Sequence, residues 1–246
     1  MLSHNNLFQN DHSTEAKRVV TRLMRPLALP KQHLVDSVDL RQWMSPIENQ
    51  GDTYTCGAHA FAALCNYLFK RSMGRHIEVS RLFIHYNAQI IEQRTFGVED
   101  IGVHLRNIAL GLRKYGVCEE KYWPYEKHLL NKMPSDLAYE RASRYTVIPL
   151  HITFDINSIE TCLHNQLPVI IGIKLLDTAA HTMQHNGGYL EVPDLDNTLI
   201  GKTGLHGAMV VGYDRKRQYF ICRNSWGNRW VRENQNILCF DLTFIQ

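Results

Sequence analysis

Cys56 stands where a polar, turn-rich stretch changes abruptly into an apolar segment. Residues 49–55 read NQGDTYT, and the apolar residues that follow recur at helical spacing to about Lys70. With Thr55 or Asp52 as the capping residue, we expect a buried helix with Cys56 in its first turn. The unsatisfied N–H groups and the positive dipole end of a helix stabilise a thiolate over a thiol. This placement predicts a nucleophilic cysteine.

A cysteine nucleophile needs a nearby base and a third group that orients the base. His206 lies just before a predicted strand at residues 208–213, and Asn224 follows a second predicted strand at residues 218–223. A tight turn joins these strands, and an antiparallel hairpin brings their far ends together. We therefore expect Asn224 to lie beside His206.

The tetrahedral intermediate of acyl transfer also needs hydrogen-bond donors for its oxyanion. Gln50 lies in the predicted turn before the helix, from which its side-chain amide can point at the space in front of the Cys56 backbone N–H. These two donors, one from a side chain and one from the main chain, form a candidate oxyanion hole.

The first half of the chain is predicted to be mainly helical. After the Cys56 helix, Ser80 is expected to cap a helix at residues 81–92. Asp100 is expected to open a third helix, with Gly116 at its C-terminal cap.

The second half of the chain changes to the period of strands. Asn157 is expected to cap a short helix there. Strands are predicted at residues 145–150, 168–174, 208–213 and 218–223. A helical half followed by a strand-rich half predicts an α+β fold of two lobes, with a ligand cleft between them.

Composition limits the partners and the compartment. With a net charge of +3 and no basic stripe interleaved with aromatic residues, nucleic acid is a poor partner. No apolar run is long enough to span a membrane, so no membrane association is expected. Residues 1–14 are polar and lack the apolar centre of a secretory signal. We therefore expect a cytoplasmic protein, or one delivered into a host cytosol by another route; the sequence carries no signal for an oligomeric state.

The cysteines are spread widely along the chain, at positions 56, 65, 118, 162, 222 and 239. An even number permits three disulfides, but that pattern is typical of short secreted chains, so we favour reduced thiols in a reducing compartment. Apart from Cys56, they fall on apolar faces and are expected in the core. Cys56 and His59 form a lone C-x-x-H pair without a second pair, so we expect neither a zinc site nor any cofactor.

Three short motifs in the expected order resemble those of the papain-like cysteine peptidases. Cys56 follows Gln50 by six residues, His206 precedes Gly212 by six, and residues 223–227 read RNSWG. The resemblance runs from about residue 38 to at least residue 230, nearly the whole chain. The segments SRLFIHYN, YGVC and WPY, which begin at residues 80, 115 and 123, are more similar to bacterial members than to plant or lysosomal ones.

The resemblance implies a papain-like two-lobe fold with the active site in the cleft. It divides the chain into an N-terminal extension at residues 1–35 and a peptidase domain at residues 36–246. Within that domain, it implies a helical lobe at about residues 50–135 and an antiparallel, β-barrel-like lobe at about residues 136–246. The extension is much shorter than the inhibitory propeptide that the family usually carries.

The resemblance also implies the activity and the roles of the site residues. It implies an endopeptidase that hydrolyses protein or peptide substrates through an acyl-enzyme on Cys56. His206 would be the base and acid, Asn224 the orienting residue, and Gln50 the oxyanion donor. Two further residues would contact or protect the bound substrate. Gly102 resembles the glycine whose main chain pairs with the substrate backbone, and Trp226 would shield the His–Asn hydrogen bond from water.

Departures from the family pattern leave alternatives open. The usual Cys-Gly-Ser-Cys-Trp is absent, and a second alignment would place His59 at the catalytic position and make the protein inactive. The spacing from Gln50 and the absence of another nearby cysteine favour Cys56. The glycine-rich stretch after RNSWG is replaced by NRWVR at residues 228–232, on the leaving-group side of the cleft. The same triad could also serve acyl transfer or deamidation, and a non-catalytic binding protein with this fold is the alternative from another class.

Overall fold

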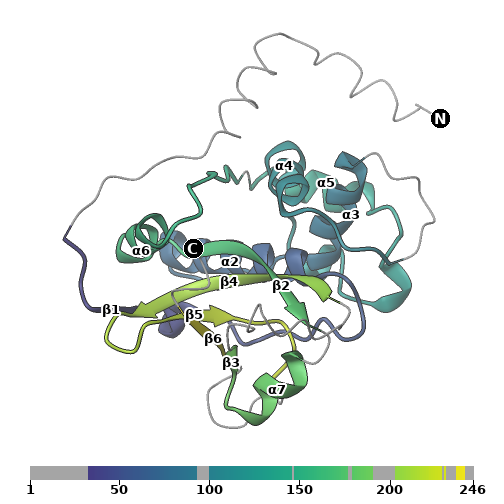
Figure 1. Ribbon diagram of the computed structural model, residues 1–246. Helices are drawn as coiled ribbons and strands as arrows, with labels where there is room; N and C mark the ends of the chain where they lie inside the picture. Colours follow the sequence, from purple (N-terminus) through teal and green to yellow (C-terminus); the bar gives the residue numbers. More distant parts are fainter. Residues whose placement is uncertain are drawn as a thin grey trace.

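The computed structural model describes residues 33–92, 100–145, 147–176, 179–190, 203–228, 230 and 237–241. A helical half and a sheet half lie on either side of one long helix, α2 (Cys56–Met73), as Figure 1 shows. This arrangement confirms the predicted α+β fold. All but the last three residues of the predicted N-terminal extension, residues 1–35, lie outside the described residues.

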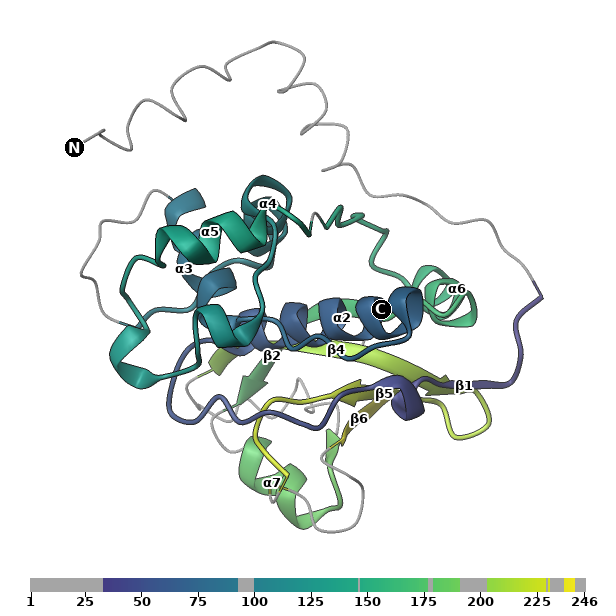
Figure 2. The ribbon, with the colours of Figure 1, turned by 180° about the vertical axis from the view of Figure 1, so that it is seen from behind.

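Helix α2 begins at Cys56, as predicted, and runs along the sheet (Figures 1 and 2). Because its residues are apolar on almost every side, both halves of the molecule pack against it. Gly74 ends the helix with φ of 67°, a left-handed conformation that glycine adopts without a steric cost. Thr55 is the N-cap residue, but its side chain makes no capping bond. Its hydroxyl lies 2.8 Å from the hydroxyl of Tyr125, so the predicted side-chain cap is wrong.

The helical half contains α3 (Arg81–Ile91), α4 (Leu105–Tyr115) and α5 (Asp136–Ala142), with 3-10 turns at Glu120–Tyr122 and Lys127–Leu129. Ser80 caps α3 as predicted, since its hydroxyl accepts the Phe83 N–H at 3.1 Å. Gly116 follows α4, and its N–H donates to the Leu112 carbonyl, also as predicted.

Asp100 does not open α4, because that helix begins only after His104. The carboxylate of Asp100 instead accepts the N–H of Tyr54 at 2.8 Å. A contact with the loop before α2 has therefore replaced the local capping bond that the sequence pattern predicts.

The sheet half contains β1 (Ser37–Asp39), β2 (Val169–Leu176), β3 (Tyr189–Leu190), β4 (Thr203–Asp214), β5 (Tyr219–Arg223) and β6 (Ile237–Asp241), with a 3-10 turn at Arg41–Trp43 after β1. Strand β4 is central: β2 and β1 pair along one of its edges, and β5, β6 and β3 follow on the other. The β3–β6 pair is parallel and the other pairs are antiparallel. Among the described strands nothing pairs the two outer edges, so the sheet is open rather than barrel-like.

Two local predictions for the second half are wrong. Tyr145 and residues 147–150 form no strand, and the Tyr145 carbonyl accepts the Val117 N–H from the helical half. None of the described strands pairs with this segment, and a strand requires a paired edge for its backbone groups. The short helix is α6 (Ile156–His164), and its capping residue is Asp155 instead of Asn157. The Asp155 carboxylate accepts the Ser158 N–H at 2.7 Å.

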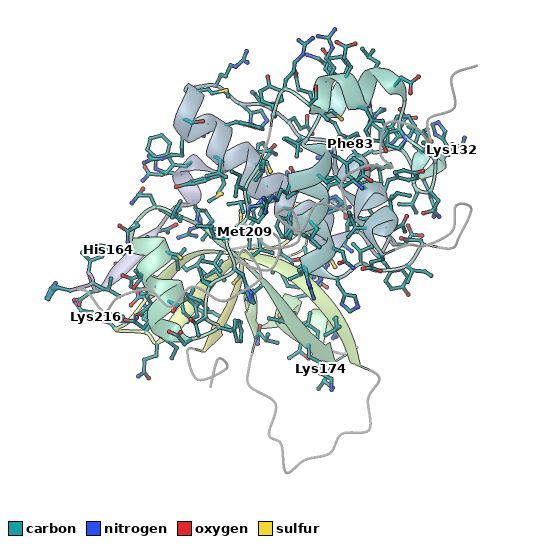
Figure 3. The ribbon with its side chains drawn as sticks, turned by 90° about the horizontal axis from the view of Figure 1, so that it is seen from above. Phe83, Lys132, His164, Lys174, Met209 and Lys216 are labelled. Atoms are coloured by element: carbon teal, nitrogen blue, oxygen red, sulfur yellow. The ribbon has the colours of Figure 1, made fainter. Side chains whose placement is uncertain are left out.

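Buried apolar side chains hold the sheet to α2 and pack the elements of the helical half together. Met209 of β4 lies between the sheet and the helices, and Phe83 of α3 lies inside the helical half (Figure 3). Both side chains are fully buried, and burial of a side chain of this size stabilises a fold by about 1.5–3 kcal/mol.

Helix α7 (Ala179–His185) follows β2 at the edge of the sheet half. None of the helices in the described residues combines the length and apolarity that a membrane crossing requires.

Candidate active site

The first turn of α2 meets strand β4 at Cys56. The sulfur of Cys56 accepts the backbone N–H of Gly207 at 3.3 Å. The Cys56 side chain is only partly buried, so solvent or a ligand can reach it. A thiol at a helix N-terminus thus lies directly beside the residue that follows His206.

His206 and Asn224 lie side by side, as the hairpin geometry predicts. The Oδ1 atom of Asn224 lies 3.0 Å from Nε2 of His206. The register of β4 and β5, which pairs Met209 with Arg223, brings these two positions together. His206 lies within β4, paired with Ile173 of β2, so the prediction that it precedes its strand is wrong. Pairing with β2 extends β4 backward through a segment whose own sequence shows no strand signal.

The His206 ring is enclosed. Burial lowers its pKa to about 4, although the hydrogen bond that His206 donates to Asn224 acts in the opposite direction. The ring of Trp226 lies 4.8 Å from the His206 ring, centroid to centroid, and Trp230 packs edge-on against Trp226 at 4.4 Å. These indole rings cover the His206–Asn224 pair and lower the dielectric constant around it.

Gln50 lies in the loop before α2 with its side chain held at both ends. Its Oε1 accepts the Ser225 hydroxyl at 2.6 Å, and its Nε2 donates to the Thr53 carbonyl at 2.7 Å. The backbone N–H of Gln50 also donates to the Ser225 carbonyl at 2.8 Å. The amide nitrogen carries a second N–H, which Thr53 does not use. Ser225 directly follows Asn224, so the Gln50 loop and the His206–Asn224 pair are linked.

His59 occupies a different environment from Cys56. Its side chain is buried, and its ring packs edge-on against Tyr125 at 4.8 Å. Because His59 is turned into the protein while Cys56 is partly exposed beside Gly207, the geometry favours Cys56 over the alternative alignment.

Sequence reasoning missed the hydroxyl groups that hold the Gln50 loop. The Tyr125 hydroxyl donates to the Gln50 carbonyl at 2.9 Å and lies 2.8 Å from the hydroxyls of both Thr53 and Thr55. The only available signal was the aromatic, proline-containing run at residues 122–125, which indicates a rigid loop but not its partner.

Gly102 is exposed and lies next to the same loop. A Cβ atom on Gly102 would lie 3.9 Å from the Tyr54 carbonyl oxygen. The Asp100–Tyr54 hydrogen bond fixes this proximity. Gly102, the predicted substrate-pairing glycine, is therefore two positions from Asp100, which anchors the loop before α2 through Tyr54.

The remaining cysteines lie apart from the site. Cys65, Cys118, Cys162 and Cys222 are buried, as predicted, and neither they nor Cys56 form a disulfide with another described cysteine. Burial raises the pKa of Cys65 and of Cys118 to about 12, so neither is a nucleophile at neutral pH. The Cys239 side chain lies outside the described residues. Among the described residues, no group of three or more His, Cys, Asp or Glu side chains is placed to hold a metal ion.

A partly exposed thiol at a helix N-terminus, next to a buried His–Asn pair in a two-lobe α+β fold, is typical of cysteine peptidases. The chain belongs to the papain family of cysteine proteases: the family's sequence profile, described as papain family cysteine protease, matches residues 34–235.

Individual relatives come from several kinds of organism. An uncharacterized peptidase C1-like protein of Acanthamoeba polyphaga mimivirus is 30% identical over 203 residues, which cover 78% of this chain and 63% of that protein. Peptidase 1 of the mite Psoroptes ovis is 28% identical over 209 residues, or 80% of this chain and 58% of the mite protein. The match thus spans about three fifths of the length of these curated relatives.

Solved structures share the fold. Xylellain, a cysteine protease from Xylella fastidiosa, superposes with a TM-score of 0.76 at 27% identity, covering 90% of this chain and 87% of that one. The digestive procathepsin L 3 of Tenebrio molitor superposes with a TM-score of 0.63 at 20% identity, covering 92% and 73%. The similarity to xylellain agrees with the predicted resemblance to bacterial members.

Proposed function

We propose that this protein is a cysteine endopeptidase that hydrolyses peptide bonds through an acyl-enzyme on Cys56. One observation carries the proposal: the Cys56 sulfur contacts Gly207 while the neighbouring His206 is held by Asn224. A nucleophile, a base and an orienting group thus converge from α2, β4 and the end of β5.

The hydrogen bond between His206 and Asn224 determines which ring nitrogen of His206 carries the proton. Oδ1 of Asn224 can only accept, so Nε2 of His206 carries a proton and Nδ1 has the lone pair. With a pKa of about 4, the ring is neutral at neutral pH and acts first as a base.

In the acylation step, Nδ1 of His206 takes the proton of the Cys56 thiol as the sulfur bonds to the scissile carbonyl carbon. The carbonyl π electrons move onto oxygen, where the Gln50 side-chain N–H and the Cys56 backbone N–H donate to the oxyanion. The carbonyl re-forms as the C–N bond breaks, and His206 passes its proton to the leaving amine.

In the deacylation step, His206 takes a proton from water as the water oxygen attacks the thioester. The C–S bond then breaks, the acid product leaves, and His206 returns the proton to the Cys56 sulfur. Each turnover consumes one water and leaves the protein unchanged.

Gly102 and Trp226 have supporting roles in this proposal. Gly102 is exposed beside the loop that precedes α2, where its backbone groups can pair with an extended substrate. Trp226 covers His206 and keeps water from competing for the His206–Asn224 hydrogen bond.

We also propose that the protein acts in a reducing compartment, the cytoplasm or a host cytosol. The unpaired geometry of Cys65, Cys118, Cys162 and Cys222 supports this, because disulfides are typical of oxidising compartments. Thiol counting on denatured protein, isolated from cells with thiols trapped at lysis, tests it, and disulfides in that sample would contradict it.

Labelling with the epoxide inhibitor E-64 tests the proposed nucleophile. Solved structures of cysteine proteases from Carica candamarcensis and Ananas comosus are complexes with this inhibitor. We expect one label, mapped by mass spectrometry to Cys56, and no label in His206→Ala. His128→Ala is the matched control, because the His128 side chain is 63% exposed, and it should label at the wild-type rate.

Two other outcomes would contradict the proposed peptide hydrolysis. Slow labelling scattered over several thiols would indicate a non-catalytic binding protein of this fold. Rapid labelling at Cys56 together with transfer of a peptide acyl group to an added amine, without release of the acid, would indicate a transferase.

A further inference from the structure

A small pocket lies beside Gly207, and two residues that line it each have a buried side-chain atom with no hydrogen-bond partner within the described part of the chain. These atoms are Nε2 of His59 and Nδ2 of Asn224, both fully buried. The cavity volume is about 10 Å³, room for about one water, and Glu48, Arg223 and Ser225 also line it beside Ala60, Ala63 and Met209. A buried polar atom without a partner costs about 1–3 kcal/mol, so this pair calls for an explanation.

The Asn224 amide presents a donor to the pocket. Its Oδ1 is engaged by Nε2 of His206 at 3.0 Å and by the Ser225 backbone N–H at 2.7 Å. Both partners donate, which fixes the amide orientation and leaves the Nδ2 hydrogens unpaired.

The His59 ring presents an acceptor to the same pocket. Its Nδ1 lies 3.1 Å from the Thr55 carbonyl oxygen, which can only accept, so Nδ1 carries the proton. Burial lowers the pKa of His59 to about 3, so the ring is neutral and its Nε2 keeps a lone pair.

A donor and an acceptor that border one small pocket fit a single bridging water. We propose that an ordered water in this pocket accepts an N–H of Asn224 and donates to Nε2 of His59, which makes His59 a positioning residue for the active site. Buried waters usually have two to four polar partners, and Glu48 and Ser225 border the site to supply more.

The other side of His59 reaches the loop that precedes the nucleophile. Its Nδ1 lies 3.2 Å from the Thr55 hydroxyl, which lies 2.8 Å from the Tyr125 hydroxyl, and Tyr125 donates to the Gln50 carbonyl at 2.9 Å. The water therefore adds a second hydrogen-bonded path between Asn224, which orients the base, and the loop that carries the oxyanion donor, beside the direct bonds of Gln50 to Ser225. His59, on α2, links the loop before that helix to Asn224 at the end of β5.

Two substitutions at His59 test this role, which rests on the proposed peptidase function. His59→Leu removes both ring nitrogens, and we expect kcat and the E-64 labelling rate to fall about tenfold, with KM within about twofold of wild type. His59→Gln keeps a donor and an acceptor and should restore the rate to within about threefold of wild type. Leu163→Ala, a fully buried change on α6, is the control for lost stability and should leave kcat unchanged.

A high-resolution crystal structure of the wild-type protein tests the water itself. We expect one ordered water within hydrogen-bond distance of both His59 Nε2 and Asn224 Nδ2. A dry pocket, or wild-type kcat in His59→Leu, would overturn the inference. Failure of the wild-type protein to react at Cys56 would instead refute the proposed function. The crystal structure tests the water independently of that function.

Discussion

The backbone N–H of Gly207 donates to the sulfur of Cys56 at 3.3 Å across 151 positions of sequence. This contact joins the helical half to the sheet at the point where the proposed nucleophile and base meet. A Cβ atom at position 207 would lie 2.9 Å from the Gly57 Cα and 3.0 Å from the Gly57 nitrogen. Both neighbours are backbone atoms that cannot rotate away, so the approach of β4 to α2 requires glycine.

Gly207→Ala is expected to push β4 away from the start of α2. We expect a loss of about 1–3 kcal/mol in the free energy of unfolding, as for other overpacked sites, and a slower reaction of Cys56 with E-64. Gly204→Ala is the matched control in the same strand, because a Cβ atom there meets nothing within 4 Å. Equal labelling rates in the two variants would show that the close approach has no role in reactivity.

Gln50→Glu tests the oxyanion role of Gln50. The glutamate keeps an oxygen to accept the Ser225 hydroxyl, as Oε1 of Gln50 does at 2.6 Å, but it has no amide N–H. We expect kcat to fall about 10²–10³-fold, the range for loss of one oxyanion donor, and stability to fall by about 1–3 kcal/mol, because the Thr53 carbonyl loses the N–H that it accepts at 2.7 Å. Steady-state kinetics with a peptide substrate measures this, and a kcat near that of wild type would refute the oxyanion assignment.

Arg81→Met is expected to destabilise the fold through the charges it leaves behind. The Arg81 guanidinium contacts Glu120 at 2.6 Å and Glu48 at 3.5 Å, and all three side chains are largely buried. Removing one partner of such a network costs about 3–5 kcal/mol, here because the Glu120 carboxylate loses its counter-ion, whereas Glu48 keeps Arg223 at 3.4 Å. Urea unfolding measures this. Arg144→Met removes an exposed i,i+4 partner of Glu140 and should change stability very little; a similar loss in both variants would contradict the argument.

Acid is expected to destabilise the protein through His59 and His206. Burial lowers the pKa of His59 to about 3 and that of His206 to about 4, so below the unfolded value the unfolded chain binds more protons. Their contribution to stability is complete above about pH 6.5 and is lost as the pH falls toward 4, by about 1.4 kcal/mol per pH unit for each histidine.

Urea unfolding across this pH range checks the prediction with one variant and one control. His59→Gln removes one of the two titrating groups, so the slope of stability against pH should become shallower. His128→Gln changes an exposed histidine and should leave the slope as it is. A slope that His59→Gln leaves unaltered would mean that His59 is not buried in its neutral form.

Local signals in the sequence were enough for the elements that carry the site. Helical spacing after a polar turn located the first turn of α2 at Cys56, and Ser80 capped α3 as its type and position predict. A hairpin has one way to bring its ends together, so the His206–Asn224 contact followed from two strands and the turn between them. The start of α2 and the cap of α3 depend on residues near one another in the chain. The His206–Asn224 contact depends on the geometry of a hairpin, which two strands and a short turn define.

Contacts between distant segments decided the rest. The carboxylate of Asp100 bonds to Tyr54, and the hydroxyl of Thr55 lies beside Tyr125. Tyr145 and residues 147–150 form no strand, because none of the described strands pairs with them. The pocket shared by His59 and Asn224 likewise forms only when α2 packs on the sheet. A polar side chain can satisfy its hydrogen bonds locally or across the fold, and only tertiary packing sets which partner is within reach.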